Sequence, residues 1–133
     1  MWAQFQSSRF WVTTGAIFAG TAVALGAYGS HVLDGDQKAY ENFMLSVQYH
    51  MWHALGLLAV GWQCKIGSES KTYAALSGIL FTVGIFMFSG NLYIFTIAGN
   101  PSTISGIPIG GTCFLGGWTF LALSALKQKK NLG

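Results

Sequence analysis

Four stretches of this chain contain no Asp, Glu, Lys or Arg: residues 10–30, 43–64, 73–98 and 106–126. Each stretch is mainly apolar, and about twenty helical residues at a rise of 1.5 Å reach across the roughly 30 Å hydrocarbon core of a membrane. The sequence therefore predicts one all-α domain over residues 1–133, an integral membrane four-helix bundle with short loops.

The composition excludes other classes of protein. Only 8% of the residues are charged, against about 25% in soluble domains, so a soluble enzyme domain is excluded. Aromatic residues make up 15% of the chain and there are only two prolines, which excludes a disordered chain. The net charge of +3 is not typical of a nucleic-acid-binding protein, because only Lys127, Lys129 and Lys130 cluster, directly after an apolar segment. Basic residues beside a span usually meet lipid headgroups, so we expect membrane lipids as partners and no nucleic acid.

The distribution of basic residues predicts the direction of the spans. Six of the seven Lys and Arg residues lie on the side of the two termini, counting the loop between the second and third spans, and Lys38 alone lies on the other side. The six are Arg9, Lys65, Lys71, Lys127, Lys129 and Lys130. Because basic residues favour the cytoplasmic side, both termini are predicted to be cytoplasmic.

Local signals place the ends of the helices. Asp36 is a candidate N-cap for the second helix, which we expect to begin near Gln37 in the interface and to enter the membrane near Phe43. The Asn100-Pro101 dipeptide belongs to a turn after the third span. Pro108 lies in the first turn of the fourth span, where its missing N–H is tolerated.

The second helix has two faces of different character. We expect its larger apolar side chains to meet lipid; these are Met51, Leu55, Leu58 and Trp62. Its polar and small residues are expected to face neighbouring helices, because an unpaired polar group is costly in hydrocarbon. These are Ser46, Tyr49, His50, His53, Gly56 and Val60. Small residues four apart, such as Gly106 and Gly110, predict close helix packing.

Polar side chains gather at one depth near the outer surface. His31 ends the first span there, while His50 and His53 lie roughly 10 and 15 Å below Phe43 along the second helix. Asn91 and Tyr93 on the third span return to roughly 7–11 Å from the same surface. The candidate polar cluster is His31, Tyr49, His50, His53, Ser89, Asn91 and Tyr93.

Three interpretations of this cluster remain open. The side chains could be structural and hydrogen-bond across helices, which we favour. They could form a small-ligand or proton-handling site, since imidazole titrates near neutral pH. They could also bind a metal or haem through His31, His50 and His53. No cofactor is expected under the structural interpretation.

No catalytic pattern competes with these interpretations. The chain has no GxSxG or HExxH motif, no phosphate-binding glycine loop and no carboxylate inside a span. We therefore predict no catalytic residues and no enzyme, and expect a structural or accessory membrane component, as a subunit of a larger complex or a homo-oligomer. The alternative is a ligand-, haem- or metal-binding membrane protein that uses the histidines.

Four ordered motifs carry a family resemblance. They are GAYGSH at residues 26–31, YHMWHAL at 49–55, FSGNLY at 88–93, and PIGG at 108–111 followed by GGW at 116–118. Together they resemble family 423 of the domains of unknown function, small multi-span proteins of bacterial inner membranes with a mitochondrial relative. The chain departs from the family pattern at Tyr28, Ser30, Asn91 and Ile107. The resemblance implies the fold, the membrane location and a role for the three histidines, but no reaction.

Overall fold

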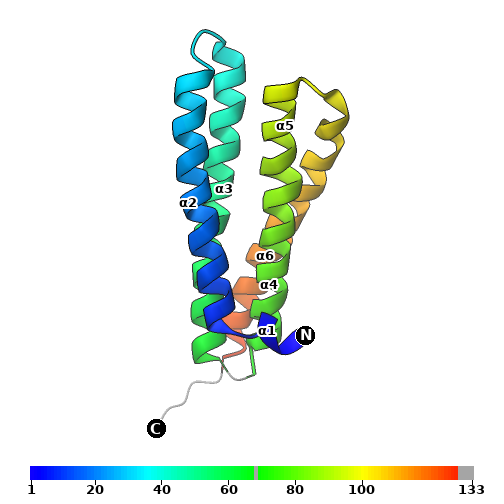
Figure 1. Cartoon of the computed structure of the whole chain (residues 1–133). Helices are drawn as coiled ribbons and strands as arrows, with labels where there is room; N and C mark the ends of the chain where they lie inside the picture. The colour runs from blue at the N-terminus through cyan, green and yellow to red at the C-terminus, as the bar shows by residue number, and fades with distance from the viewer. Residues whose placement is uncertain (68, 129–133) are drawn as a thin grey trace.

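The structure is a computed structural model that describes residues 1–67 and 69–128, and the regular secondary structure of these residues is helical. The long helices lie roughly side by side, and consecutive ones run in opposite directions (Figure 1). The elements are α1 (Trp2–Phe5), α2 (Ser8–Val32), α3 (Gln37–Ile66), α4 (Lys71–Gly84), the π-helix η1 (Ile85–Gly90), α5 (Asn91–Ala98), the 3-10 helix η2 (Pro101–Ser105) and α6 (Gly106–Leu126).

Three helical stretches are long and apolar enough to cross a membrane. They are α2, the stretch Lys71–Ala98 that runs through α4, η1 and α5, and the stretch Pro101–Leu126 that contains α6. The helix α3 is 30 residues long but is more polar, because it carries Ser46, Gln48, His50 and His53. The all-helical prediction is confirmed for the described residues, together with three apolar helices of sufficient length.

Two features at helix ends have the form that the sequence indicates. The Asp36 side chain accepts a hydrogen bond of 3.0 Å from the backbone N–H of Ala39 and so caps α3. The turn before α6 is stabilised by Asn100, whose side-chain oxygen accepts from the backbone N–H of Ser102 at 3.1 Å. Helix α6 then begins at Gly106, so Pro108 lies in its first turn.

The helix α3 is central, because α2 packs along one side of it and α4 and α5 pack along another. Helix α4 packs mainly on α6, whereas α5 packs mainly on α3. The core lies toward the end of the bundle that holds the two termini (Figure 1), and it is aromatic as well as aliphatic. Its buried members are Trp11, Leu57, Val60, Cys64, Ala74, Phe81, Ile85 and Phe114.

Glycines allow these aromatic rings to fit between closely spaced helices. The Phe81 ring lies between Gly56 of α3 and Gly117 of α6, and a Cβ atom at either position would come within 3 Å of a ring carbon. Gly84 is covered by Phe114 and Gly78 by Trp11 in the same way. Replacing such a glycine would push apart two helices that now approach closely.

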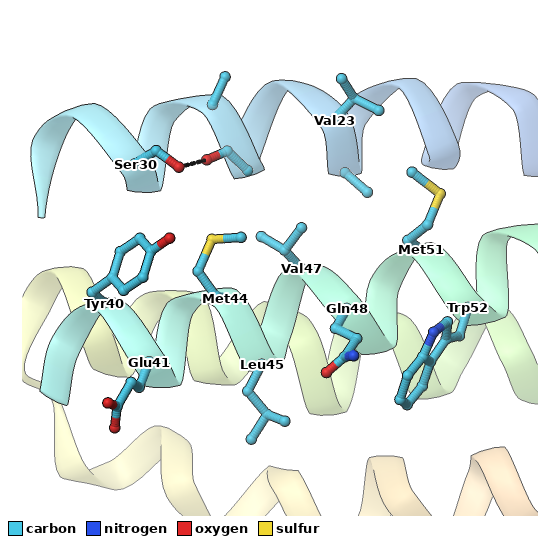
Figure 2. Close-up of a pocket in the computed structure, with 13 residues that line it drawn as sticks. Val23, Ser30, Tyr40, Glu41, Met44, Leu45, Val47, Gln48, Met51 and Trp52 are labelled. Carbon is cyan, nitrogen blue, oxygen red and sulfur yellow. Dashed lines mark hydrogen bonds between the residues drawn. The ribbon is translucent and has the colours of Figure 1, made fainter. Parts of the chain in front are cut away.

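The prediction of the two faces of the second helix is correct for one face and partly wrong for the other. Ser46, His50 and His53 are buried, as expected. Met51 and Leu58, which we assigned to lipid, are instead half-buried. In Figure 2 Met51 points toward α2, and the side chain of Leu58 lies close to Gly15. The reason is that α2 packs along this side of α3 and covers it.

Candidate functional site

His50 lies on α3 and faces α5 and α2. Its Nδ1 atom is 3.2 Å from the hydroxyl oxygen of Tyr93, and the Phe18 ring packs edge-on against the imidazole with 5.8 Å between ring centroids. The residue is 5% exposed, and its Nε2 atom is buried without a hydrogen-bond partner among the described residues. An unpaired buried polar atom is costly, so His50 is the member of the cluster whose hydrogen bonding is incomplete.

His53 lies one helical turn deeper and has both ring nitrogens paired. Its Nδ1 atom is 2.6 Å from the carbonyl oxygen of Tyr49, and its Nε2 atom is 3.1 Å from the indole Nε1 of Trp118. A carbonyl only accepts and an indole N–H only donates, so Nδ1 carries the proton and Nε2 accepts. The ring also stacks on Phe114 with 3.4 Å between centroids. His53 therefore links α3 to α6 as a neutral imidazole.

Two serines join α3 to the third span reciprocally. The Ser46 hydroxyl donates to the carbonyl oxygen of Ser89 at 2.7 Å, and the Ser89 hydroxyl donates to the carbonyl oxygen of Ser46 at 3.0 Å. Both residues are fully buried. Each hydroxyl is satisfied by backbone of the opposite helix, so the pair fixes the register of the two helices.

The π-helix η1 brings Ser89 into this position. A π-helix contains one more residue per turn than an α-helix and is often found at functional sites. Here it spans Ile85–Gly90, so it separates α4 from α5 and includes Ser89. The turn that follows it carries Tyr93, the partner of His50. The sequence predicted a single span over residues 73–98 and did not predict this element.

The remaining members of the predicted cluster lie apart or bond locally. His31 is exposed in the last turn of α2. Asn91 donates to the carbonyl oxygen of Met87 on its own span at 2.7 Å, and not to a histidine. The Tyr49 ring stacks on Phe88, with 4.5 Å between centroids. The structure thus brings together His50 with Tyr93 and Ser46 with Ser89, but not the three histidines.

The positions and hydrogen bonds of the histidines limit what the cluster can bind. Within residues 1–67 and 69–128 no group of three His, Cys, Asp or Glu side chains lies close enough to hold a metal ion. His53 would have to give up the bond to Trp118 before Nε2 could bind anything else. Sequence reasoning did not identify Trp118 as a partner of His53, although the GGW motif at 116–118 places an indole beside a small residue that allows close approach.

Comparison with known proteins shows the family to which the chain belongs. Residues 25–111 match a family model described as "Protein of unknown function (DUF423)". The chain belongs to this family. The matched region includes the motifs that end α2 and form the middle of α3, so it contains His31, His50 and His53. The resemblance noted from the sequence is confirmed.

Curated relatives extend the likeness to nearly the whole chain. The UPF0382 membrane protein YwdK of Bacillus subtilis is 37% identical over 123 residues, which cover 90% of this chain and 98% of the relative. The UPF0382 inner membrane protein YgdD of Escherichia coli K12 is 31% identical over 128 residues, which cover 93% and 95% of the two chains. No solved structure matches. The protein is therefore an inner-membrane protein of a family whose function is unknown.

Proposed function

We propose that the protein crosses the membrane four times, with α3 as the fourth span and both termini in the cytoplasm. The 30 residues of α3 reach about 45 Å at helical rise, which exceeds the hydrocarbon core. Its Ser46, His50 and His53 are buried against neighbouring helices, so they do not meet lipid. Six of seven Lys and Arg residues on the side of the termini support the orientation.

Reporter fusions test this topology. A fluorescent protein that matures only in the cytoplasm should be active at the C-terminus, and a reporter active only in the periplasm should be active in the loop after residue 33. The reverse pattern, or opposite sides for the two termini, would contradict the four-span arrangement.

We further propose that the protein is a structural or accessory membrane component and not an enzyme. The observation that carries this proposal is that buried polar side chains are used to join helices. Ser46 and Ser89 bond reciprocally, and the buried Ser77 hydroxyl donates to the carbonyl oxygen of Gly117 at 2.7 Å. His53 joins α3 to α6. Groups bound in this way are not free to act as nucleophile or base.

Such a component needs a surface for association, and α3 offers one. Exposed residues recur along it at alternating spacings of four and three, which is the repeat of a helix that packs lengthwise against another helix. They are Glu41, Leu45, Gln48, Trp52, Leu55, Ala59, Trp62 and Ile66. In Figure 2 Leu45, Gln48 and Trp52 all point away from α2. We call this set the α3 stripe.

The α3 stripe contains one uncharged polar residue, Gln48, and its environment indicates what covers the stripe. Gln48 is exposed, and its side-chain amide has no hydrogen bond among the described residues. It nevertheless lies about 7 Å below Phe43 at helical rise. An unpaired amide at this depth is costly in hydrocarbon. A second copy related by a two-fold axis would place another Gln48 opposite, and an amide both donates and accepts. We therefore propose a homodimer through the α3 stripe.

Cysteine crosslinking tests the dimer in native membranes. In a background with Cys64→Ser and Cys113→Ser, Leu45→Cys and Leu55→Cys should each give a disulfide-linked dimer on oxidation. Leu115→Cys is the matched control, because Leu115 is 72% exposed on α6 and lies outside the stripe. A dimer that forms with Leu115→Cys but not with Leu45→Cys or Leu55→Cys would contradict the interface. A crosslink from the stripe to a different protein would contradict the homodimer and identify that protein as the partner.

The amide is tested separately. Gln48→Leu should weaken dimerisation about 3- to 30-fold in detergent, because interhelical hydrogen bonds in membranes contribute about 0.6–2 kcal/mol. The dimer fraction is measured by light scattering across a range of detergent-to-protein ratios. An unchanged dimer in Gln48→Leu would show that the amide does not pair across it.

A second candidate function is ligand binding at the histidines. The observation that favours it is the unpaired Nε2 atom of His50. This candidate uses a different surface from the α3 stripe, so the two functions can hold together or fail independently.

A further inference from the structure

A narrow crevice lies between α2 and the third span, beside His50. Its volume is about 240 Å³. Its lining residues are Ile17, Phe18, Thr21, Leu25, His50, Ile85, Phe86, Gly90 and Tyr93. Ile17 and Phe86 are 61% and 62% exposed, so they form its rim. Because both helices of this rim are apolar spans, the crevice opens toward the lipid and not toward water.

One of the residues that line the crevice has a polar atom that needs a partner. The Thr21 hydroxyl already donates to the carbonyl oxygen of Ile17 at 2.9 Å. The Tyr93 hydroxyl is paired with Nδ1 of His50. The Nε2 atom of His50 remains, on a side chain that is 5% exposed. The site is therefore apolar with a single point for hydrogen bonding, the usual composition of a small-molecule site.

The proton on His50 can be placed from its neighbour. Among the residues that the structure describes, Nδ1 is paired with the hydroxyl of Tyr93, and a phenol is acidic enough to donate well to an imidazole nitrogen. When Tyr93 donates, the neutral imidazole carries its proton on Nε2. The imidazole that lines the crevice then carries an unpaired N–H donor, and a ligand that pairs with it must supply an acceptor oxygen.

The alternatives to an organic ligand fit less well. A buried water molecule requires two to four polar partners, and only Nε2 is free among the lining groups. A metal ion requires further ligands, and none lies close enough among the residues that the structure describes. The crevice is also smaller than the 300–1,000 Å³ typical of sites that enclose a drug-sized molecule, so it would take one ring of a ligand whose remainder extends into the bilayer.

We infer that this crevice binds the ring of a lipid-soluble quinone, with one carbonyl oxygen accepting a hydrogen bond from Nε2 of His50. The ring would lie against the aromatic side chains of Phe18 and Phe86, which contact each other edge to face with 5.7 Å between their centroids, and its tail would leave past the exposed rim. This assignment makes specific the ligand-binding candidate above. It does not depend on the dimer, because the α3 stripe contains none of the crevice residues.

The test uses protein labelled with ¹⁵N-histidine in phosphatidylcholine nanodiscs. A decyl-substituted benzoquinone is titrated in, and the Nε2 resonance of His50, assigned with the three single histidine variants, should shift to saturation. Decylbenzene has the same tail but no carbonyl and should not shift it. His50→Phe keeps a ring of similar size, and binding followed by calorimetry should weaken about tenfold or more, as expected for one lost hydrogen bond.

Two variants on α2 separate binding from folding. Thr14→Val removes a hydroxyl that is already bonded within α2 and lies outside the crevice, so it should leave quinone affinity within about twofold. Thr21→Trp fills the crevice from an exposed position and should abolish binding, which keeps the test decisive if His50→Phe does not fold. Equal binding of quinone and decylbenzene, unchanged binding in His50→Phe or Thr21→Trp, or no quinone binding because phospholipid occupies the site would each overturn the inference.

Discussion

The Phe81 ring offers a direct test of how tightly these helices are packed. A Cβ atom at Gly117 would lie 2.5 Å from Cδ1 of the ring and 2.6 Å from Cε1, roughly 1 Å closer than the optimal separation of two carbon atoms. The opposite edge of the ring faces Gly56, where a Cβ atom would lie 2.9 Å from Cε2. Phe81 is fully buried, so it can retreat from one glycine only toward the other.

The expected cost of Gly117→Ala follows from this geometry. Overpacking a well-packed core costs about 1–3 kcal/mol, and alanine recovers about 0.5–1 kcal/mol over glycine inside a helix. We therefore expect a net loss of about 1–2 kcal/mol in the free energy of unfolding. Gly111→Ala on the same helix is the matched control, because nothing lies within 4 Å of the added Cβ. It should be neutral or stabilise by up to about 1 kcal/mol.

The measurement is reversible unfolding of purified protein in mixed micelles, followed by circular dichroism as the fraction of dodecyl sulfate rises. The double variant Gly56→Ala/Gly117→Ala should lose more free energy than the sum of the single changes, because the ring then has no direction of retreat. Simple additivity would mean that the helices separate instead of the ring moving. A Gly117→Ala protein as stable as Gly111→Ala would refute the packing argument.

The other predictions use the same unfolding measurement. Ser46→Ala and Ser89→Ala should each lower the free energy of unfolding by about 0.5–2 kcal/mol. Their effects should nearly add in a double-mutant cycle, because the two hydroxyls use different acceptors. A strong non-additive term would contradict this. Trp118→Phe removes the donor to Nε2 of His53 and should cost about 1 kcal/mol, whereas an unaffected protein would show that this bond contributes nothing. Asp36→Ala should cost about 0.5–2 kcal/mol through the lost cap of α3, and Asp36→Asn should recover most of it.

The sequence was sufficient for the features that depend on chain periodicity and on helix-end chemistry. The charge-free run at 106–126 coincides with the bounds of α6, and the Asp36 cap forms as expected. The burial of His50 also followed from the face of α3 on which it lies. These features are local, so they can be deduced without knowing which helices are neighbours.

The pairing of side chains across helices could not be deduced in this way. Matching depths suggested both Asn91 and Tyr93 as neighbours of the histidines, but the Asn91 amide bonds within its own span. Tyr93 is the residue that reaches His50, because the π-helix rotates the end of the span relative to its beginning. A depth argument counts residues along the membrane normal and contains no information about rotation around the helix axis.

The π-helix divides the third span into two halves, α4 and α5, whose side chains point in directions that are offset from each other around the helix axis. Each residue of an α-helix advances the side-chain direction by about 100°, so the extra residue in Ile85–Gly90 offsets the faces of α5 from those of α4. Helix α4 is thereby oriented to fit α6, and α5 is oriented to fit α3. Deleting Met87 from η1 would leave both halves helical, yet it would turn Tyr93 away from His50 by roughly one quarter of a revolution. A one-residue change in length would thus disconnect the histidine site without altering any residue in it.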